Sequence, residues 1–245
     1  MRAFHSDPAI KAKYVDRIAA HRAGGTLLKG VGYWTDGKGN ATGCAIRGSN
    51  HALFETELGI PQMLARMQDT IFEGLPADQA QLWPSRFLAA VEPGADLTAV
   101  GWRLIYWLLT DPSVNPAITA PSVNEAMQQC AAVVAPLCGA GSADRKAALA
   151  AQEAAIQAAW AVQYRTYIAQ KSAALSAKAA MNAALMQSQP GMAAGAASSV
   201  LWNAAEGAGY SAPGERSRPD IREAAVHAAW GKMADKLIDL TKGGV

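Results

Sequence analysis

Hydrophobic side chains recur along most of this sequence at spacings of three and four residues, which is the period of an α-helix. Ile10, Tyr14 and Ile18 follow this spacing after Ser6-Asp7-Pro8, a side-chain cap with proline in the first turn. The stretch Ile60–Ile71 carries a second stripe of the same kind. The pattern predicts a mainly α-helical chain, with further helices starting at Ser49 or Asn50 and covering Ala77–Trp83, Pro84–Val91, Leu97–Thr110 and Val123–Leu137.

The stretch Thr26–Ser49 departs from this pattern, because glycines punctuate two short runs of strand-forming residues. These runs are Val31–Trp34 and Thr42–Ile46, and Asp36-Gly37 between them is typical of a tight turn. A small β-hairpin or an ordered glycine-rich loop is therefore expected over 26–49, and no other β structure is predicted.

The second half is rich in alanine, which supplies about a third of the residues over Ser142–Glu206. Many of these alanines are spaced by four and three residues, a seam along one face of a helix that lets a second helix approach closely. Large residues at Trp160, Tyr164 and Tyr167 interrupt the seam. Close packing is favoured over the alternative that alanine only raises helix propensity. The seam consists of Ala147, Ala151, Ala154, Ala158 and Ala161, and then of Ala169, Ala173, Ala177, Ala180 and Ala184.

These patterns suggest a division near the proline-rich segment Asp111–Pro121. Residues 1–120 form a compact helical domain that carries the glycine-rich hairpin. Residues 121–245 form an alanine-rich helical hairpin or bundle, either separate or packed as one unit with the first, on which a last helix from Pro219 docks.

Composition and charge narrow the class of protein. Of the 245 residues, 51% are hydrophobic, which is enough to bury a core. Lysine and arginine number 22 and acidic residues 20, so no basic face is implied and nucleic acid is not a favoured partner. The most apolar run, Leu104–Leu109, is far shorter than the roughly 20 residues of a membrane span. The first residues lack the core of a secretion signal, so a cytoplasmic protein with free thiols at Cys44, Cys130 and Cys138 is expected.

Four segments resemble a group of uncharacterised alanine-rich proteins of bacterial and phage genomes. They are Lys38-Gly39 with Gly43-Cys44, Glu57–Pro61, Ile71–Pro76 and Lys232–Leu237. The alanine repeats are also similar to the helical repeats of putative immunity proteins. The resemblance implies a setting of mobile elements and phage–host conflict, and it carries no catalytic motif.

The densest polar and glycine-rich stretch, 29–66, is the candidate ligand site. Ammonium and guanidinium groups suit phosphate, exposed backbone N–H groups suit an anion, and aromatic rings stack on a base. A P-loop is absent, because Gly37-Lys38-Gly39-Asn40 lacks the required spacing. The structural alternative is a hairpin that caps the helical core. The candidate residues are Lys29, Tyr33, Trp34, Lys38, Arg47, His51 and Arg66.

An enzyme is the rival class, with Cys44 as nucleophile and His51 with Glu55 one turn apart as an acid–base pair. A solvated His–Glu pair explains the same spacing. The other histidines are scattered, so neither a metal site nor a cofactor is predicted. Most tryptophans are expected in the core, while an exposed subset would mark a partner surface. The sequence therefore favours a non-catalytic binding protein that sequesters a small nucleotide-like anionic ligand. The alternatives are a helical inhibitor that occludes a partner protein and the Cys44 enzyme, and a homo-oligomer is conceivable.

Overall fold

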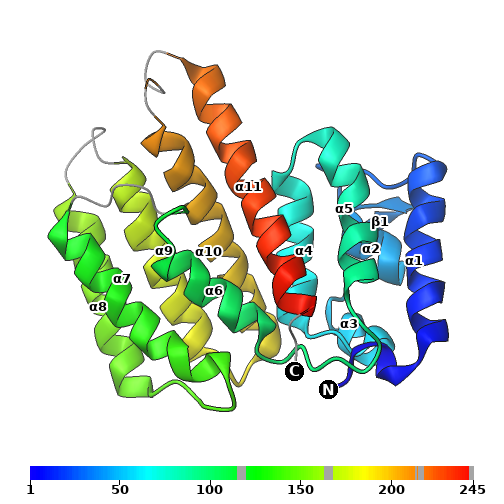
Figure 1. Cartoon of the computed structure of the whole chain (residues 1–245), viewed down its shortest axis with the longest axis horizontal. Coiled ribbons are helices and arrows are strands. Elements are labelled where there is room, and N and C mark those ends of the chain that lie inside the picture. Colours follow the sequence, from blue (N-terminus) through cyan, green and yellow to red (C-terminus); the bar gives the residue numbers. More distant parts are fainter. Residues whose placement is uncertain (115–119, 163–167, 213, 215–217, 243–245) are drawn as a thin grey trace. The chain divides into compact units, whose positions relative to one another are not determined.

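The computed structural model describes residues 1–114, 120–162, 168–212, 214 and 218–242. Helices make up 75% of the chain, and the described strands form one antiparallel hairpin (Figure 1). The predicted mainly α-helical fold with a small β-hairpin is confirmed. The chain divides into two compact units, Met1–Gly101 with Met233–Val245, and Trp102–Lys232. The division falls within helix α6, before the proline-rich segment.

The first unit is built around helix α4, which packs against α2, α3 and α5. Leu64, Met67 and Ile71 on α4 are fully buried, as the hydrophobic spacing predicted. Arg86 of α5 forms an ion pair of 3.0 Å with Asp235 of α11, which places the last turns of α11 in this unit. Its elements are the 3-10 helix Ala3–Ser6, α1 Pro8–Ala23, β1 Trp34–Thr35, β2 Lys38–Gly39, α2 Ala41–Ile46, α3 Ala52–Leu58, α4 Gln62–Gly74 and α5 Ala77–Ala90.

Local capping signals set the first helix boundaries. The Asp7 carboxylate accepts a hydrogen bond of 2.8 Å from the backbone N–H of Ala9, and Pro8 lies in the first turn of α1. Gly59 ends α3 with a φ of 63°, and a Cβ there would lie 2.1 Å from the carbonyl oxygen of Arg2. Glycine at this position therefore satisfies both the left-handed backbone and the close approach.

The glycine-rich segment contains the predicted turn but not the predicted second strand. Asp36 and Gly37 have φ angles of 51° and 79°, as a tight hairpin turn requires. The run Thr42–Ile46, expected as a strand, lies instead in helix α2, so this prediction is wrong. The reason is the Asn40 side chain, which accepts a hydrogen bond of 2.9 Å from the backbone N–H of Gly43 and so caps a helix.

The sequence suggested that one helix ends at Trp83 and another begins at Pro84. This prediction is wrong, since α5 continues through Pro84. Proline inside a helix removes one backbone hydrogen bond. The neighbouring side chains of Trp83 and Phe87 are fully buried, and we attribute the continuity of α5 to this packing.

The second unit is a helical bundle in which α9 packs against α7, α8 and α10 (Figure 1). Its elements are α6 Val100–Thr110, α7 Pro121–Val134, the 3-10 helix Ala135–Cys138, α8 Arg145–Ala161, α9 Ile168–Leu185, α10 Pro190–Ser211 and α11 Pro219–Lys242, of which 219–232 belong to this unit.

The alanine seam is buried on α9 but displaced on α8. Of the predicted α9 positions, Ala173, Ala177, Ala180 and Ala184 are buried, and Ala169 near the start of the helix is half-buried. On α8 the buried face is Ala148, Ala151, Ala155 and Ala158, whereas Ala147 and Ala161 of the predicted seam are exposed. Alanine occupies both faces of α8, so its spacing alone does not select the face that packs. Tyr164 and Tyr167 lie outside the described residues.

Candidate functional site

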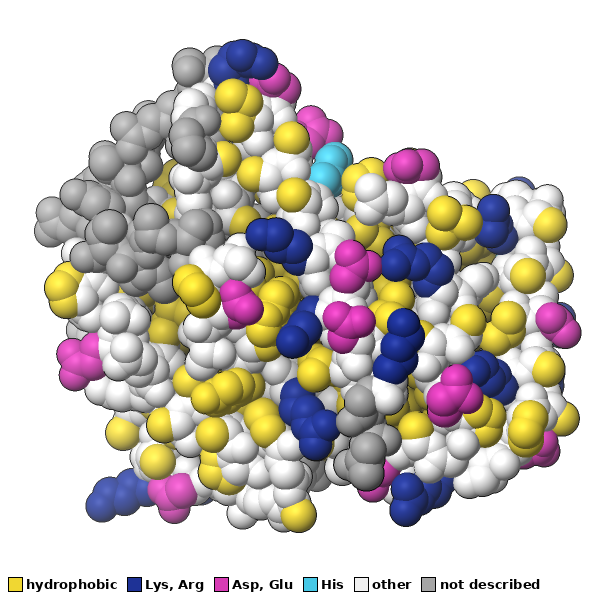
Figure 2. Space-filling model, in the orientation of Figure 1, with side chains coloured by type: hydrophobic (Ala, Val, Ile, Leu, Met, Phe, Trp, Pro, Cys, Tyr) yellow, Lys and Arg dark blue, Asp and Glu magenta, His cyan; other side chains and the backbone are white. Residues whose placement is uncertain are grey.

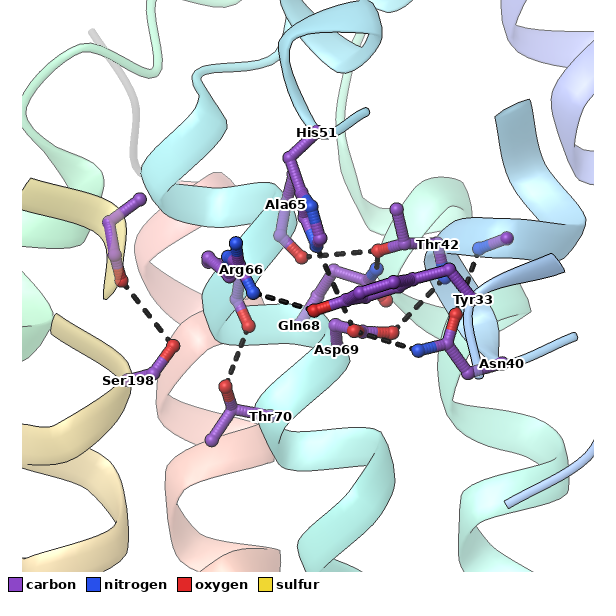
Figure 3. Close-up of polar contacts among 12 residues, drawn as sticks. Tyr33, Asn40, Thr42, His51, Ala65, Arg66, Gln68, Asp69, Thr70 and Ser198 are labelled. Atoms are coloured by element: carbon purple, nitrogen blue, oxygen red, sulfur yellow. Dashed lines mark hydrogen bonds and ion pairs between the residues drawn. The ribbon is translucent and has the colours of Figure 1, made fainter. Parts of the chain in front are cut away.

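The glycine-rich segment is joined to helix α4 by a buried polar network around Asp69 (Figure 3). Asp69 Oδ2 accepts a hydrogen bond of 3.0 Å from Asn40 Nδ2, and Oδ1 accepts one of 3.2 Å from the backbone N–H of Thr42. Gln68 Nε2 donates to Thr42 Oγ1 at 2.9 Å. These side chains are all buried, so their hydrogen bonds replace those lost from water. The network explains why the segment is ordered.

Tyr33, His51 and Arg66 meet beside this network. The Tyr33 and His51 rings pack edge to face with centroids 4.9 Å apart, and Arg66 donates a hydrogen bond of 2.6 Å to the Tyr33 hydroxyl. His51 Nε2 is buried without a hydrogen-bond partner among the described residues, and it lies 3.8 Å from Asp69 Oδ2, which is too long for a hydrogen bond. An anion bound here would face the buried Asp69 carboxylate, so the cluster is poorly suited to phosphate.

The other four predicted ligand residues do not converge on this cluster. Lys29 donates a hydrogen bond to the carbonyl oxygen of Leu75, and the Trp34 ring packs against His21 with centroids 5.3 Å apart. Lys38 is exposed on β2, and Arg47 is exposed at the end of α2.

The proposed enzyme group is not assembled in the structure. Burial raises the pKa of the Cys44 thiol to about 11, and this thiol donates to the carbonyl oxygen of Gly39 at 3.3 Å. Such a thiol stays protonated near neutral pH and is a weak nucleophile. Glu55 accepts a hydrogen bond of 3.0 Å from the backbone N–H of Gln62, and His51 faces Asp69 instead. Among the described residues, no group of three or more His, Cys, Asp and Glu side chains is placed to hold a metal ion.

A groove of about 380 Å³ between α10 and α11 offers a second candidate site, one that the sequence interpretation missed. Such a volume is within the range of small-molecule sites. Three of its side chains follow one another at four-residue spacing on α10, and two do so on α11, so each helix presents one face to the groove. The lining residues are Trp202, Ala205, Glu206 and Tyr210 of α10 with Arg222 and Val226 of α11. We call it the α10–α11 groove.

The aromatic residues of the α10–α11 groove are held in place by their neighbours. The Trp202 ring packs edge to face on the buried Trp230, with centroids 4.8 Å apart, yet 48% of Trp202 remains exposed. A Cβ on Gly209 would lie 2.5 Å from Val226, so glycine allows α11 to approach α10 closely. Trp202 was expected in the core. Its four-residue spacing with Glu206 and Tyr210 was the signal that could have indicated a polar and aromatic face.

Arg222 supplies the positive charge of the α10–α11 groove. It donates a hydrogen bond of 3.1 Å to the Tyr210 hydroxyl and lies 5.1 Å from the centre of the same ring. A guanidinium has five N–H donors, and within the part of the chain that the structure describes one hydrogen bond, to Tyr210, uses them. Elsewhere on the face shown in Figure 2, basic and acidic side chains are interspersed rather than gathered by sign.

A second groove, of about 420 Å³, lies between α7 and α8 and is lined mainly by small apolar side chains. Its carboxylate, Asp144, already accepts a hydrogen bond of 2.7 Å from the backbone N–H of Ala147 and so caps α8. Farther along α8, Leu149 and Trp160 are 46% and 78% exposed. This helix therefore presents apolar area but few groups that would fix a small polar ligand.

Comparisons with protein-family models, curated proteins and solved structures find no match for this chain. Among the described residues, no helix combines the length and the apolar character needed to span a membrane.

Proposed function

We propose that this chain is a non-catalytic binding protein that captures a small nucleotide-like anionic ligand in the α10–α11 groove. The observation that carries the proposal is the pairing of a half-exposed ring, Trp202, with a cation, Arg222, in one concave site. A nucleotide needs a stacking surface for its base and a charge-assisted donor for its phosphate. The groove offers both, and Tyr210 orients the cation.

The glycine-rich segment is a weaker site for the same ligand. Two of its basic side chains, Lys29 and Arg66, already donate hydrogen bonds within the protein. Lys38 and Arg47 remain exposed, and the Trp34 ring in this segment packs against His21. We therefore propose the α10–α11 groove, and not residues 29–66, as the ligand site. The Tyr33–His51–Arg66 cluster then serves to stabilise the fold.

The phage–host setting is part of this proposal, and only the sequence resemblance supports it. In that setting, a protein that sequesters a nucleotide signal would act by lowering its free concentration, so neither turnover nor a cofactor is needed.

Occlusion of a partner protein is the second candidate function, and the exposed face of α8 favours it. Leu149, Ile156 and Trp160 share one side of this helix, and tryptophan is enriched at the centres of protein interfaces. A partner helix with an apolar stripe is the occupant this face would suit.

Calorimetric titration with GMP, AMP, GDP and ADP tests the first proposal. We expect Arg222→Ala to weaken binding about tenfold, because a charge-assisted hydrogen bond contributes about 1.5 kcal/mol or more. Trp202→Ala should weaken it by a similar factor, since base stacking contributes about 1–3 kcal/mol. The matched control is Arg145→Ala, which removes an exposed arginine of α8 that does not line the groove. Absence of binding to every nucleotide, or an Arg222→Ala variant as tight as the parent, would overturn the proposal.

A further inference from the structure

The groove contains one acidic side chain, Glu206, midway between its two aromatic ends. On α10, Glu206 follows Trp202 by four residues and precedes Tyr210 by four, so it lies about 6 Å along the helix axis from each. The structure gives the Glu206 carboxylate no hydrogen-bond or ion-pair partner within the described part of the chain. Glu206 is exposed, so its carboxylate is accessible to a ligand in the groove.

An ionised carboxylate only accepts hydrogen bonds. It therefore repels a phosphate or an acceptor edge, and it binds best to two neighbouring N–H donors. Among the common nucleobases, guanine carries two such donors side by side, the ring N–H and the exocyclic amine. Adenine places a ring acceptor beside its amine, and cytosine does the same, so each would set a lone pair against the carboxylate.

The two charges of the groove come from different helices. Glu206 is on α10 and Arg222 is on α11. Arg222 is held at Tyr210, at the end of the groove away from Trp202. Glu206 and Arg222 are both exposed, so a guanine nucleotide stacked on Trp202 can reach the carboxylate with its donor edge and the guanidinium with its phosphate.

We infer that the ligand of the α10–α11 groove is a guanine nucleotide, and that Glu206 is the residue that selects guanine over adenine. This inference rests on the proposed nucleotide-binding function. It adds a determinant of specificity that the stacking and phosphate contacts do not supply, because every base has a stacking face.

Parallel titrations with GMP and AMP test the inference. We expect the parent to bind GMP at least tenfold more tightly than AMP, since a bidentate contact to a base edge discriminates by about that factor or more. Glu206→Gln should lower this ratio to near one, because the amide presents one donor and one acceptor and so accommodates adenine. Glu223→Gln is the matched control, as Glu223 is exposed on α11 outside the groove, and it should leave the ratio unchanged.

The outcomes separate the two claims. Equal affinity for GMP and AMP in the parent, or an unchanged ratio in Glu206→Gln, would overturn the guanine inference while the nucleotide-binding proposal stands, provided that binding still depends on Arg222. If GMP, AMP, GDP and ADP all fail to bind, both claims fail. A circular dichroism melt of Glu206→Gln that matches the parent shows that any change in ratio is not caused by unfolding.

Discussion

Arg222 of α11 donates a hydrogen bond of 3.1 Å to the Tyr210 hydroxyl of α10, and its guanidinium carbon lies 5.1 Å from the centre of the Tyr210 ring. The Tyr210 side chain thus contacts the Arg222 guanidinium both through its hydroxyl group and through the face of its ring. The contact fixes the guanidinium before a ligand arrives, which lowers the conformational entropy lost on binding.

Removing only the hydroxyl of Tyr210 tests this positioning. Tyr210→Phe keeps the ring beneath Arg222 but deletes the acceptor, and a hydrogen bond has a net worth of about 0.5–1.5 kcal/mol. We expect roughly two- to tenfold weaker nucleotide binding by calorimetry. Tyr106→Phe, on the exposed side of α6, serves as the control. Unchanged affinity in Tyr210→Phe would show that the hydroxyl does not position the cation.

The alanine faces of α8 and α9 lead to a prediction about stability. Ala155 and Ala177 are both fully buried, so replacing either with leucine forces extra volume into a packed interface. We expect each variant to lose about 1–3 kcal/mol of unfolding free energy in urea titrations. Ala147→Leu, on the exposed side of α8, should change stability by no more than about 0.5 kcal/mol. Two core variants as stable as the parent would refute the close packing.

The Asp69 network predicts opposite effects for two neighbouring residues. Asp69→Ala leaves the Asn40 amide and the Thr42 N–H buried without an acceptor, and each such loss costs about 1–3 kcal/mol. His51→Phe keeps an aromatic ring against Tyr33 and removes a buried nitrogen that lies 3.8 Å from Asp69 Oδ2 and has no hydrogen-bond partner among the described residues. We expect it to match or exceed the parent in thermal stability. A lower melting temperature for His51→Phe would indicate that the imidazole makes a stabilising contact in solution.

Two thiols and one phenol have raised pKa values, so we expect the unfolding free energy to fall in alkaline solution. Burial raises the pKa of Cys44 to about 11 and that of Cys130 to about 12, from an ordinary value of 9.0. Burial and the hydrogen bond to Glu57 raise the pKa of Tyr14 from 10.0 to about 12. The unfolded chain therefore releases these protons first and binds fewer of them than the folded chain, so the unfolding free energy falls as pH rises from about 9 towards 12.

Urea unfolding at several pH values across this interval measures the effect. A Cys130→Ala variant should show a shallower decline than the parent, because one of the responsible protons is gone. Identical slopes in the two proteins would contradict the assignment to Cys130.

Sequence patterns predicted the fold where one local signal dominates. The Asp7 cap follows from chemistry within one turn and appears as expected. The error at Thr42–Ile46 arose because one glycine and one threonine lower helix propensity there, whereas the Asn40 cap and the burial of the whole run determine the outcome. Tertiary contacts of this kind are not visible in a short window of sequence.

The candidate site was less predictable than the fold. Three of the seven proposed ligand residues, Tyr33, His51 and Arg66, do come together, but beside the buried Asp69, which follows Arg66 on α4 and lies outside the predicted stretch 29–66. The groove residues Trp202 and Arg222 lie on different helices, α10 and α11, and the packing of these helices brings them into one site. Their spacing along each helix is visible in the sequence, whereas their pairing across helices is not.

Nucleotide binding in the α10–α11 groove can be tested by observing which tryptophan responds to a nucleotide. The chain has seven tryptophans, and each indole N–H gives one signal in a nitrogen–proton correlation spectrum. Single Trp→Phe variants assign the signals of Trp202, Trp230 and Trp34. During separate titrations with GMP and AMP, we expect the signals of Trp202 and its neighbour Trp230 to shift with nucleotide concentration. The signal of Trp34, in the glycine-rich segment, should not shift. Movement confined to Trp34, or no movement at millimolar nucleotide, would contradict this expectation.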